Sequence, residues 1–96
     1  MEVESIRHRA LRQFFLTGQS RGLGRNVDRL RKMLAFIDAA HCLEELYLPP
    51  NYGLHELTGD RKGTWAMTVT RNWRLTFRLN EDNALIDLDL EDYHGS

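Results

Sequence analysis

The sequence predicts an α+β domain in which two N-terminal helices pack against a β-sheet. Apolar residues recur at helical spacing in residues 8–41, and they alternate with polar residues from Tyr52 onward. The pair Pro49-Pro50 lies between these regions and breaks the chain. Because helices followed by a run of strands are typical of α+β domains, we expect the sheet in the second half of the chain.

The first helix is predicted from His8 to Thr17, where Ala10, Leu11, Phe14 and Phe15 cluster at helical spacing. The preceding residues 3–6 are read as a short strand or as the lead into this helix, with Ser5 as its expected N-cap. Gly18 stands where a C-terminal cap belongs.

A glycine-rich connection, residues 18–24, follows the first helix. No strand leads into it and no Lys-Ser/Thr pair follows, so it predicts a helix–helix turn and not a phosphate loop. Asn26 is the expected cap of a second helix that runs to about His41. One face of this helix is apolar and carries Val27, Leu30, Leu34, Ile37 and His41.

Four basic residues gather at the beginning of the second helix: Arg25, Arg29, Arg31 and Lys32. The helix dipole favours anions at this end, so its interaction with these four positive charges is unfavourable. An external anion would explain the cluster, and so would a solvated basic face. Both interpretations remain open from the sequence.

Four strands are predicted in residues 52–57, 64–70, 73–79 and 84–91. The residues expected to pack the sheet against the helices are Trp65, Met67, Val69, Trp73, Leu75 and Phe77. Both tryptophans are therefore interpreted as core residues. In the last strand, Ala84, Ile86, Leu88 and Leu90 share one face, in alternation with Leu85, Asp87, Asp89 and Glu91.

A chain of 96 residues accommodates one domain with a modest core, without room for a second domain or a large cofactor pocket. It has no apolar run of about 18 residues and no apolar stretch of a secretory signal near its start. Its single cysteine, Cys42, cannot form an internal disulfide. These features predict a cytoplasmic protein with no membrane association.

Charge is unevenly distributed along the chain, although the net charge is only −1. Residues 1–78 carry all 13 Lys and Arg and 8 acids, for a net charge of +5, and residues 79–96 carry 6 acids and no base. A basic body suggests a polyanion as partner. The acidic tail argues against nonspecific binding over the whole surface, and a mixed solvated surface is the alternative.

Five basic residues surround the predicted central hairpin: Arg61, Lys62, Arg71, Arg74 and Arg78. Arg74 and Arg78 should project from the sheet face opposite the tryptophans, two register positions apart on one strand face. Planar guanidinium groups suit phosphate recognition through paired hydrogen bonds. The competing interpretation is pairing with the acids of the last strand, Asp87, Asp89 and Glu91.

His55 precedes this hairpin, and the last strand ends on Asp92, Tyr93 and His94. Two imidazoles could share acid and base roles, and RNA supplies its own nucleophile in the 2′-hydroxyl. No metal-ligand spacing is present, so no metal is expected. We expect the end of the chain to fold back beside the strand of His55. The alternative is that both groups are structural.

Three motifs occur together: L-H-x-L-x-G-D-R-x-G-x-W at residues 54–65, N-W-R-[IL]-T-F at residues 72–77, and E-D-Y-H at residues 91–94. With this spacing the sequence resembles a HigB-type toxin of the RelE superfamily, also called plasmid maintenance system killer proteins. The resemblance covers residues 1–94 as a single toxin domain. The last two residues, Gly95 and Ser96, are expected to be an appended remnant.

The resemblance implies a compact RelE-like domain with two N-terminal helices on a mostly antiparallel, twisted sheet. It implies a type II toxin that inhibits translation as a ribosome-dependent endoribonuclease, cutting mRNA in the A site without metal or cofactor. The expected partners are the ribosome, mRNA and a HigA-like helix-turn-helix antitoxin, through which the toxin would meet operator DNA indirectly. The basic start of the second helix would face ribosomal RNA.

By position, the resemblance assigns catalytic roles to His55, Asp92, Tyr93 and His94, and scissile-phosphate binding to Arg74. Relatives often carry lysine at the position of Thr58 and a basic residue at the position of Thr70. These departures motivate an alternative function, a non-catalytic module of the same fold that binds the ribosome or a protein.

Overall fold

The computed structural model describes residues 1–50 and 52–93. In this part of the chain, the α-helices are α1 (Arg9–Thr17) and α2 (Val27–Ala39), and the short 3-10 helices are η1 (Gly24–Asn26), η2 (Leu43–Tyr47) and η3 (Gly59–Arg61). The strands are β1 (His55–Glu56), β2 (Thr64–Thr68), β3 (Trp73–Leu79) and β4 (Leu85–Asp92). This order of elements confirms the predicted α+β class.

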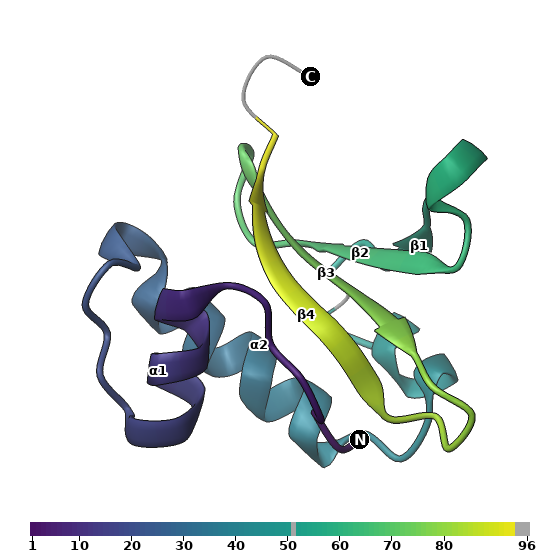
Figure 1. The fold of residues 1–96 in the computed structure, drawn as a ribbon, viewed down its shortest axis with the longest axis horizontal. Helices are drawn as coiled ribbons and strands as arrows, with labels where there is room; N and C mark the ends of the chain where they lie inside the picture. Colours follow the sequence, from purple (N-terminus) through teal and green to yellow (C-terminus); the bar gives the residue numbers. More distant parts are fainter. Residues whose placement is uncertain (51, 94–96) are drawn as a thin grey trace.

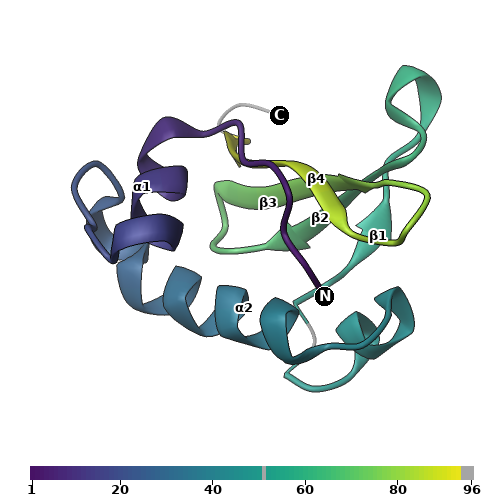
Figure 2. The ribbon, with the colours of Figure 1, turned by 60° about the horizontal axis from the view of Figure 1, so that its bottom comes forward.

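The strands form one antiparallel sheet in the order β1-β2-β3-β4. Figure 1 shows a strongly twisted sheet with α1 and α2 on the same side of it. Figure 2 shows the two layers, with α2 running along one side of the sheet. Within the described residues no helix covers the opposite sheet face, so that face presents its side chains outward.

The core lies between the helices and one sheet face, as the alternation predicts. Met67 pairs with Leu75 in the register of β2 and β3, and Phe77 lies two pairs further along, on the same face, opposite Trp65. Met67, Leu75 and Phe77 are fully buried, together with Leu30, Met33 and Ile37 of α2. The two tryptophans are half-buried and pack against this core.

The N-terminal segment runs parallel to β4 through bridges between Val3 and Leu85 and between Ile6 and Leu88. The Arg7 amide donates to the Leu88 carbonyl oxygen at 2.7 Å, which ends this contact. The segment therefore covers the first part of the β4 edge, and an edge with unpaired backbone groups is otherwise a site of aggregation.

The predicted N-cap of α1 is wrong, because the cap is His8 and not Ser5. The Nδ1 atom of His8 accepts a hydrogen bond from the Leu11 amide at 3.1 Å, which satisfies one of the orphan donors of the first turn. The Ser5 hydroxyl oxygen instead accepts from the Asp87 amide at 2.8 Å. At the other end, Gly18 caps the helix at φ 79°, as predicted.

Replacing His8 with alanine is expected to lower the free energy of unfolding by about 1 kcal/mol, since the Leu11 amide loses its acceptor. His8→Asn restores a side-chain acceptor at the cap and should recover most of this loss. Urea denaturation of the three proteins measures the difference. Equal losses for the alanine and asparagine variants would show that the imidazole does not act as a cap.

The second helix begins where predicted, directly after Asn26, and ends before the predicted His41. Asn26 occupies the N-cap position, but its side chain makes no capping hydrogen bond, since η1 winds directly into α2. The helix ends at Ala39 because Ala40 is extended, with φ −73° and ψ 146°. His41, predicted on the apolar face, is exposed, and its amide donates to a Glu45 carboxylate oxygen at 2.8 Å.

Two predicted strands differ in detail. The strand expected over residues 52–57 is regular only at His55–Glu56, and Gly53, with φ 70°, turns the chain beforehand. In β4 a bulge opposite residues 76–78 places Asp87 at φ 55° and breaks the alternation. As a result Leu85 is fully buried, whereas Ile86, predicted on the same face as Leu88, is only half-buried.

Candidate functional site

We use the name outer face for the sheet face that points away from α1 and α2. Strand register places on it His55, Thr64, Ala66, Thr68, Arg74, Thr76, Arg78, Asp89 and Glu91. One row across the four strands reads His55, Ala66, Thr76, Asp89, and the next row reads Thr68, Arg74, Glu91. The predicted imidazole and guanidinium groups therefore belong to one polar surface.

Strand β4, which leads to the end of the chain, does not lie beside the strand of His55, so the expected adjacency is wrong for the described residues. Strands β2 and β3 separate β1 from β4, which stand at opposite edges of the sheet. His55 and Arg74 are two strands and two residues apart, a Cα separation of about 12 Å for ordinary strand spacing. Two long side chains converging on a phosphate can bridge such a gap.

His55 is exposed, and its ring is oriented by the chain just before it. The Nδ1 atom lies 2.9 Å from the carbonyl oxygen of Gly53. Since a carbonyl oxygen can only accept, Nδ1 carries the proton in this contact. The neutral ring then has its lone pair at Nε2, which is the protonation state that a general base needs.

Arg74 is held at the turn between β2 and β3. Its Nη1 donates to the carbonyl oxygens of Thr70 at 2.6 Å, Trp73 at 3.1 Å and Arg71 at 3.2 Å. Its Cζ lies 5.1 Å from the centre of the Tyr93 ring, in a cation–π contact. All of these partners are uncharged, so the positive charge of Arg74 is not neutralised by them. Because the three hydrogen bonds use Nη1, a bidentate phosphate contact would use Nε and Nη2.

The end of β4 brings Tyr93 to Arg74. The Tyr93 amide donates to the Asn72 carbonyl oxygen at 2.6 Å, so the chain stays paired after the strand ends. Asp92 lies opposite Trp73 in the register and is exposed, and its side chain leaves the strand on the face opposite Glu91. The prediction for His94 falls outside the described residues.

An ion pair between Arg61 and Glu91 spans the outer face from η3 to β4. Nη1 and Nη2 of Arg61 donate to the two Glu91 carboxylate oxygens at 3.0 and 2.7 Å, and the Thr76 hydroxyl also donates to Glu91. The Arg61 hydrogen bond lowers the pKa of Glu91 and, in turn, raises that of Arg61. Of the five predicted phosphate ligands, Arg61 thus follows the competing interpretation.

The stability of the fold is expected to depend on pH through this pair. Because the pKa of Glu91 is lowered in the folded state, its contribution is fully present above the ordinary value of 4.5 and is lost as the pH falls below it. Glu91→Gln should cost about 0.5–1 kcal/mol at neutral pH, because the pair is partly exposed, and less near pH 3.

Urea denaturation at both pH values measures this difference. Glu81→Gln, which neutralises an exposed acid of the β3–β4 turn, is the matched control. A Glu91→Gln effect equal to that of the control, or unchanged between the two pH values, would contradict a stabilising ion pair.

A groove of about 240 Å³ on the outer face has both members of this ion pair in its lining. Its basic residues are Arg7, Arg61 and Arg78, and its acidic residues are Asp60, Asp87, Asp89 and Glu91. Arg78 therefore faces a mixed surface. Arg71, on the β2–β3 turn, and Lys62, directly after η3, are both exposed.

Two of the four basic residues at the start of α2 have partners among the described residues, and two do not. Arg29 donates to the Val69 carbonyl oxygen, and its Cζ lies 5.2 Å from the Tyr52 ring centre. Arg31 pairs with Asp28 at 2.7 Å. These two arginines stabilise the fold, whereas Arg25 and Lys32 are exposed and make no ion pair within the described residues.

The described residues contain neither a cluster of metal ligands nor a helix that could span a membrane. Across residues 1–50 and 52–93, no three His, Cys, Asp or Glu side chains are grouped so as to hold a metal ion. None of the helices in those residues combines the length and the apolar character that crossing a membrane requires.

Glu91 and Thr76 also belong to the site, although the sequence pattern did not predict them as functional residues. Glu91 was predicted only as an ion-pair partner that competes with phosphate for the arginines. It lies two residues from Asp89 and from Tyr93 along the chain, and this spacing places it on the outer face. Thr76 is only 2% exposed beneath the ion pair, and its place between Arg74 and Arg78 was the available signal.

Comparisons with known proteins agree on one family. A sequence model described as the RelE-like toxin of the type II toxin–antitoxin system HigB matches residues 4–94. Endoribonuclease HigB of Proteus vulgaris is 41% identical over 93 residues, covering 96% of this chain and 99% of that protein. The crystal structure of a YafQ mutant from E. coli matches with a TM-score of 0.63 at 18% identity, over 98% of this chain and 96% of that chain, which supports the fold.

Proposed function

This chain belongs to the HigB-like family of RelE-like toxins of type II toxin–antitoxin systems, and on that premise we propose that it is a ribosome-dependent endoribonuclease. A type II toxin has an antitoxin partner, and we propose a HigA-like helix-turn-helix protein in that role. The substrate is mRNA in the ribosomal A site. The observation that carries the proposal is the outer face, where His55, Arg74 and Tyr93 stand on one polar surface.

The chemistry needs only a proton acceptor, a cation at the phosphate and a proton donor, because RNA brings its own nucleophile. His55 removes the 2′-hydroxyl proton through Nε2, which the hydrogen bond from Nδ1 to Gly53 leaves unprotonated in the neutral ring. Arg74 stabilises the charge that develops on the phosphorane. The planar fork of its guanidinium matches two phosphate oxygens.

The end of the chain supplies the remaining groups. Tyr93 contacts the guanidinium of Arg74, which supports a role in positioning the base or the phosphate next to it. His94 protonates the leaving 5′-oxygen, as the resemblance to the family implies. Asp92 orients a histidine or acts as a base in this proposal, from a register position that puts its side chain on the face opposite Glu91 and away from the outer face.

The other basic residues extend the RNA contacts in this proposal. Arg71, Arg78 and Lys62 meet the message around the outer face, and Arg25 and Lys32 meet ribosomal RNA from the start of α2. Arg61 is bound to Glu91, so it contributes by shaping the groove beside the scissile phosphate.

Mapping of mRNA 5′ ends after induction of the protein in cells tests this function. Cleavage predicts new 5′ ends inside translated codons, and the same RNA without ribosomes should stay intact. Stalled ribosomes on an intact message would contradict cleavage and favour the non-catalytic module that the threonines at positions 58 and 70 suggest. Thr70 contacts Arg74 only through its carbonyl oxygen, so its side chain brings no charge to the site.

A further inference from the structure

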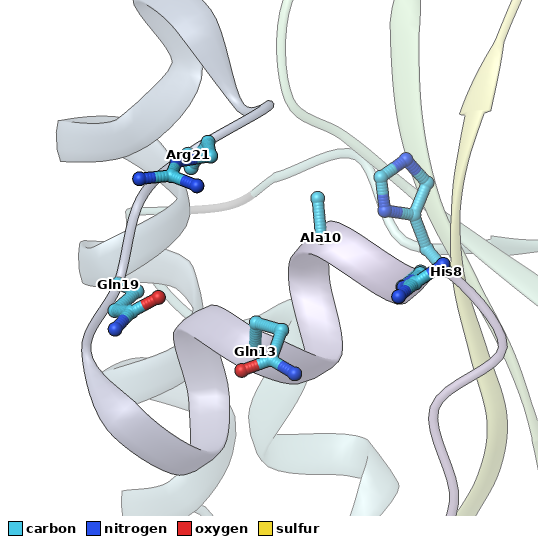
Figure 3. A pocket seen from close by; sticks show the side chains of 6 residues that line it. His8, Ala10, Gln13, Gln19 and Arg21 are labelled. Atoms are coloured by element: carbon cyan, nitrogen blue, oxygen red, sulfur yellow. The ribbon is translucent and has the colours of Figure 1, made fainter.

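We propose that the pocket between α1 and the loop that follows it is a second phosphate-binding site, which holds the backbone of an RNA strand. The pocket has a volume of about 570 Å³ and is lined by His8, Arg9, Ala10, Gln13, Gln19 and Arg21. Figure 3 shows side chains of α1 on one side of it and Gln19 and Arg21 of the loop on the other. The choice of RNA as ligand rests on the proposed function.

The loop approaches the helix closely at one point. Gly22 has φ 87°, and a Cβ atom there would lie 3.1 Å from the Cβ of Ala10. A side chain at this position would therefore be strained and would push the loop away from α1. The contact fixes the preceding residue, Arg21, across the pocket from Gln13, and Arg9 also lines the pocket.

The lining carries hydrogen-bond donors and positive charge, with no carboxylate among its six residues. Neither Arg9 nor Arg21 makes an ion pair or a side-chain hydrogen bond to any other described residue. Gln13 and Gln19 add amide donors. His8 accepts the Leu11 amide at Nδ1, so the neutral ring carries its proton at Nε2 and can donate from there.

This composition favours a phosphate over other ligands. Two arginines, two amides and an N–H of imidazole match the acceptor oxygens of a phosphodiester. The groove on the outer face differs, because carboxylates there balance the arginines. An anion would therefore enter the α1 pocket with less competition from internal partners.

The two sites adjoin around the edge of β4. Arg7 lines the groove on the outer face, and the next two residues, His8 and Arg9, line the α1 pocket. The hydrogen bond from the Arg7 amide to Leu88 fixes this turn of the chain against β4. An RNA strand held in the α1 pocket can thus pass the edge of the sheet toward the outer face.

Salt dependence of RNA binding by the full chain tests the inference. The probe is a single-stranded oligonucleotide with 2′-O-methyl groups throughout, which cannot be cut by attack of the 2′-oxygen. Each lost phosphate contact lowers the slope of log K against log salt by about 0.7. Arg9→Gln and Arg21→Gln are each expected to show this loss, and the double variant about 1.4.

Asn83→Asp is the matched control, because it lowers the net charge by one unit at an exposed position of the β3–β4 turn whose φ of 61° suits aspartate. Arg9→Lys and Arg21→Lys should keep the slope of the wild type, which separates charge from packing. Slopes of the glutamine variants that match the control would overturn the site.

Two further probes fix the nature of the ligand. Inorganic phosphate should bind much more weakly than the oligonucleotide and lose affinity in the same variants. If instead a poly-glutamate peptide loses affinity in the variants while the oligonucleotide does not, the RNA assignment is overturned. The binding test does not depend on cleavage. If mRNA shows no new 5′ ends in cells but the glutamine variants still lower the salt slope, the proposed catalysis is rejected and the phosphate-binding pocket is retained.

Discussion

Replacing Arg74 with alanine is expected to slow cleavage of ribosome-bound mRNA by about 10²- to 10³-fold, the usual cost of removing one donor that stabilises transition-state charge. The structure holds this guanidinium at the β2–β3 turn through three carbonyl oxygens and the Tyr93 ring. Single-turnover cleavage on programmed ribosomes measures the effect, because it separates the chemical step from product release.

Arg74→Lys is the informative companion variant. A lysine retains the charge but cannot make two parallel hydrogen bonds, so it should recover only part of the lost rate. Circular dichroism and urea denaturation check that the turn around Thr70 and Trp73 stays folded without the guanidinium. A rate for Arg74→Ala equal to that of the wild type would exclude Arg74 as the phosphate ligand.

Replacing His55 with alanine is expected to reduce the rate by about 10²- to 10⁴-fold, the range found for the loss of a general base. His55 is exposed on the outer face and its Nδ1 faces the Gly53 carbonyl oxygen, so little packing is lost with the ring. The same single-turnover assay measures the rate, and thermal denaturation should show a near-normal melting temperature.

The pH profile separates a base from a structural residue. If His55 accepts the 2′-hydroxyl proton, the rate of the wild type rises with pH as the reactive neutral ring becomes available, and His55→Ala loses this rise. His55→Gln keeps a polar side chain of similar reach and serves as control. A pH profile of His55→Ala parallel to that of the wild type would assign the base to another group.

The fold could be predicted where the alternation of apolar and polar residues depends on which side chains are buried. Alternation in β2 and β3 gave the correct core face, because Met67, Leu75 and Phe77 have to meet the helices. In β4 the alternation failed at Asp87, since its bulge is tied to Ser5, a residue 82 positions away that accepts its amide hydrogen bond. No local period reports such a contact.

The sequence predicted which residues belong to the site better than it predicted how they are arranged. Periodicity placed Arg74 on the face opposite the tryptophans, the register agrees, and the register adds His55 to the same face. The separation of β1 from β4 could not be predicted, because strand order depends on tertiary pairing and not on residue type. The same holds for Arg61, whose choice of Glu91 over a ligand depends on where η3 lies above β4.

The central claim is that His55 and Arg74 act on the same phosphate in one transition state. A double-mutant cycle with His55→Ala and Arg74→Ala, measured as single-turnover cleavage on programmed ribosomes, tests it most directly. Groups that act as a unit are strongly non-additive, so the double variant should be scarcely slower than the more impaired single variant. A double variant slowed by the full product of the two single effects would show that the residues act independently, and would contradict a shared site on the outer face.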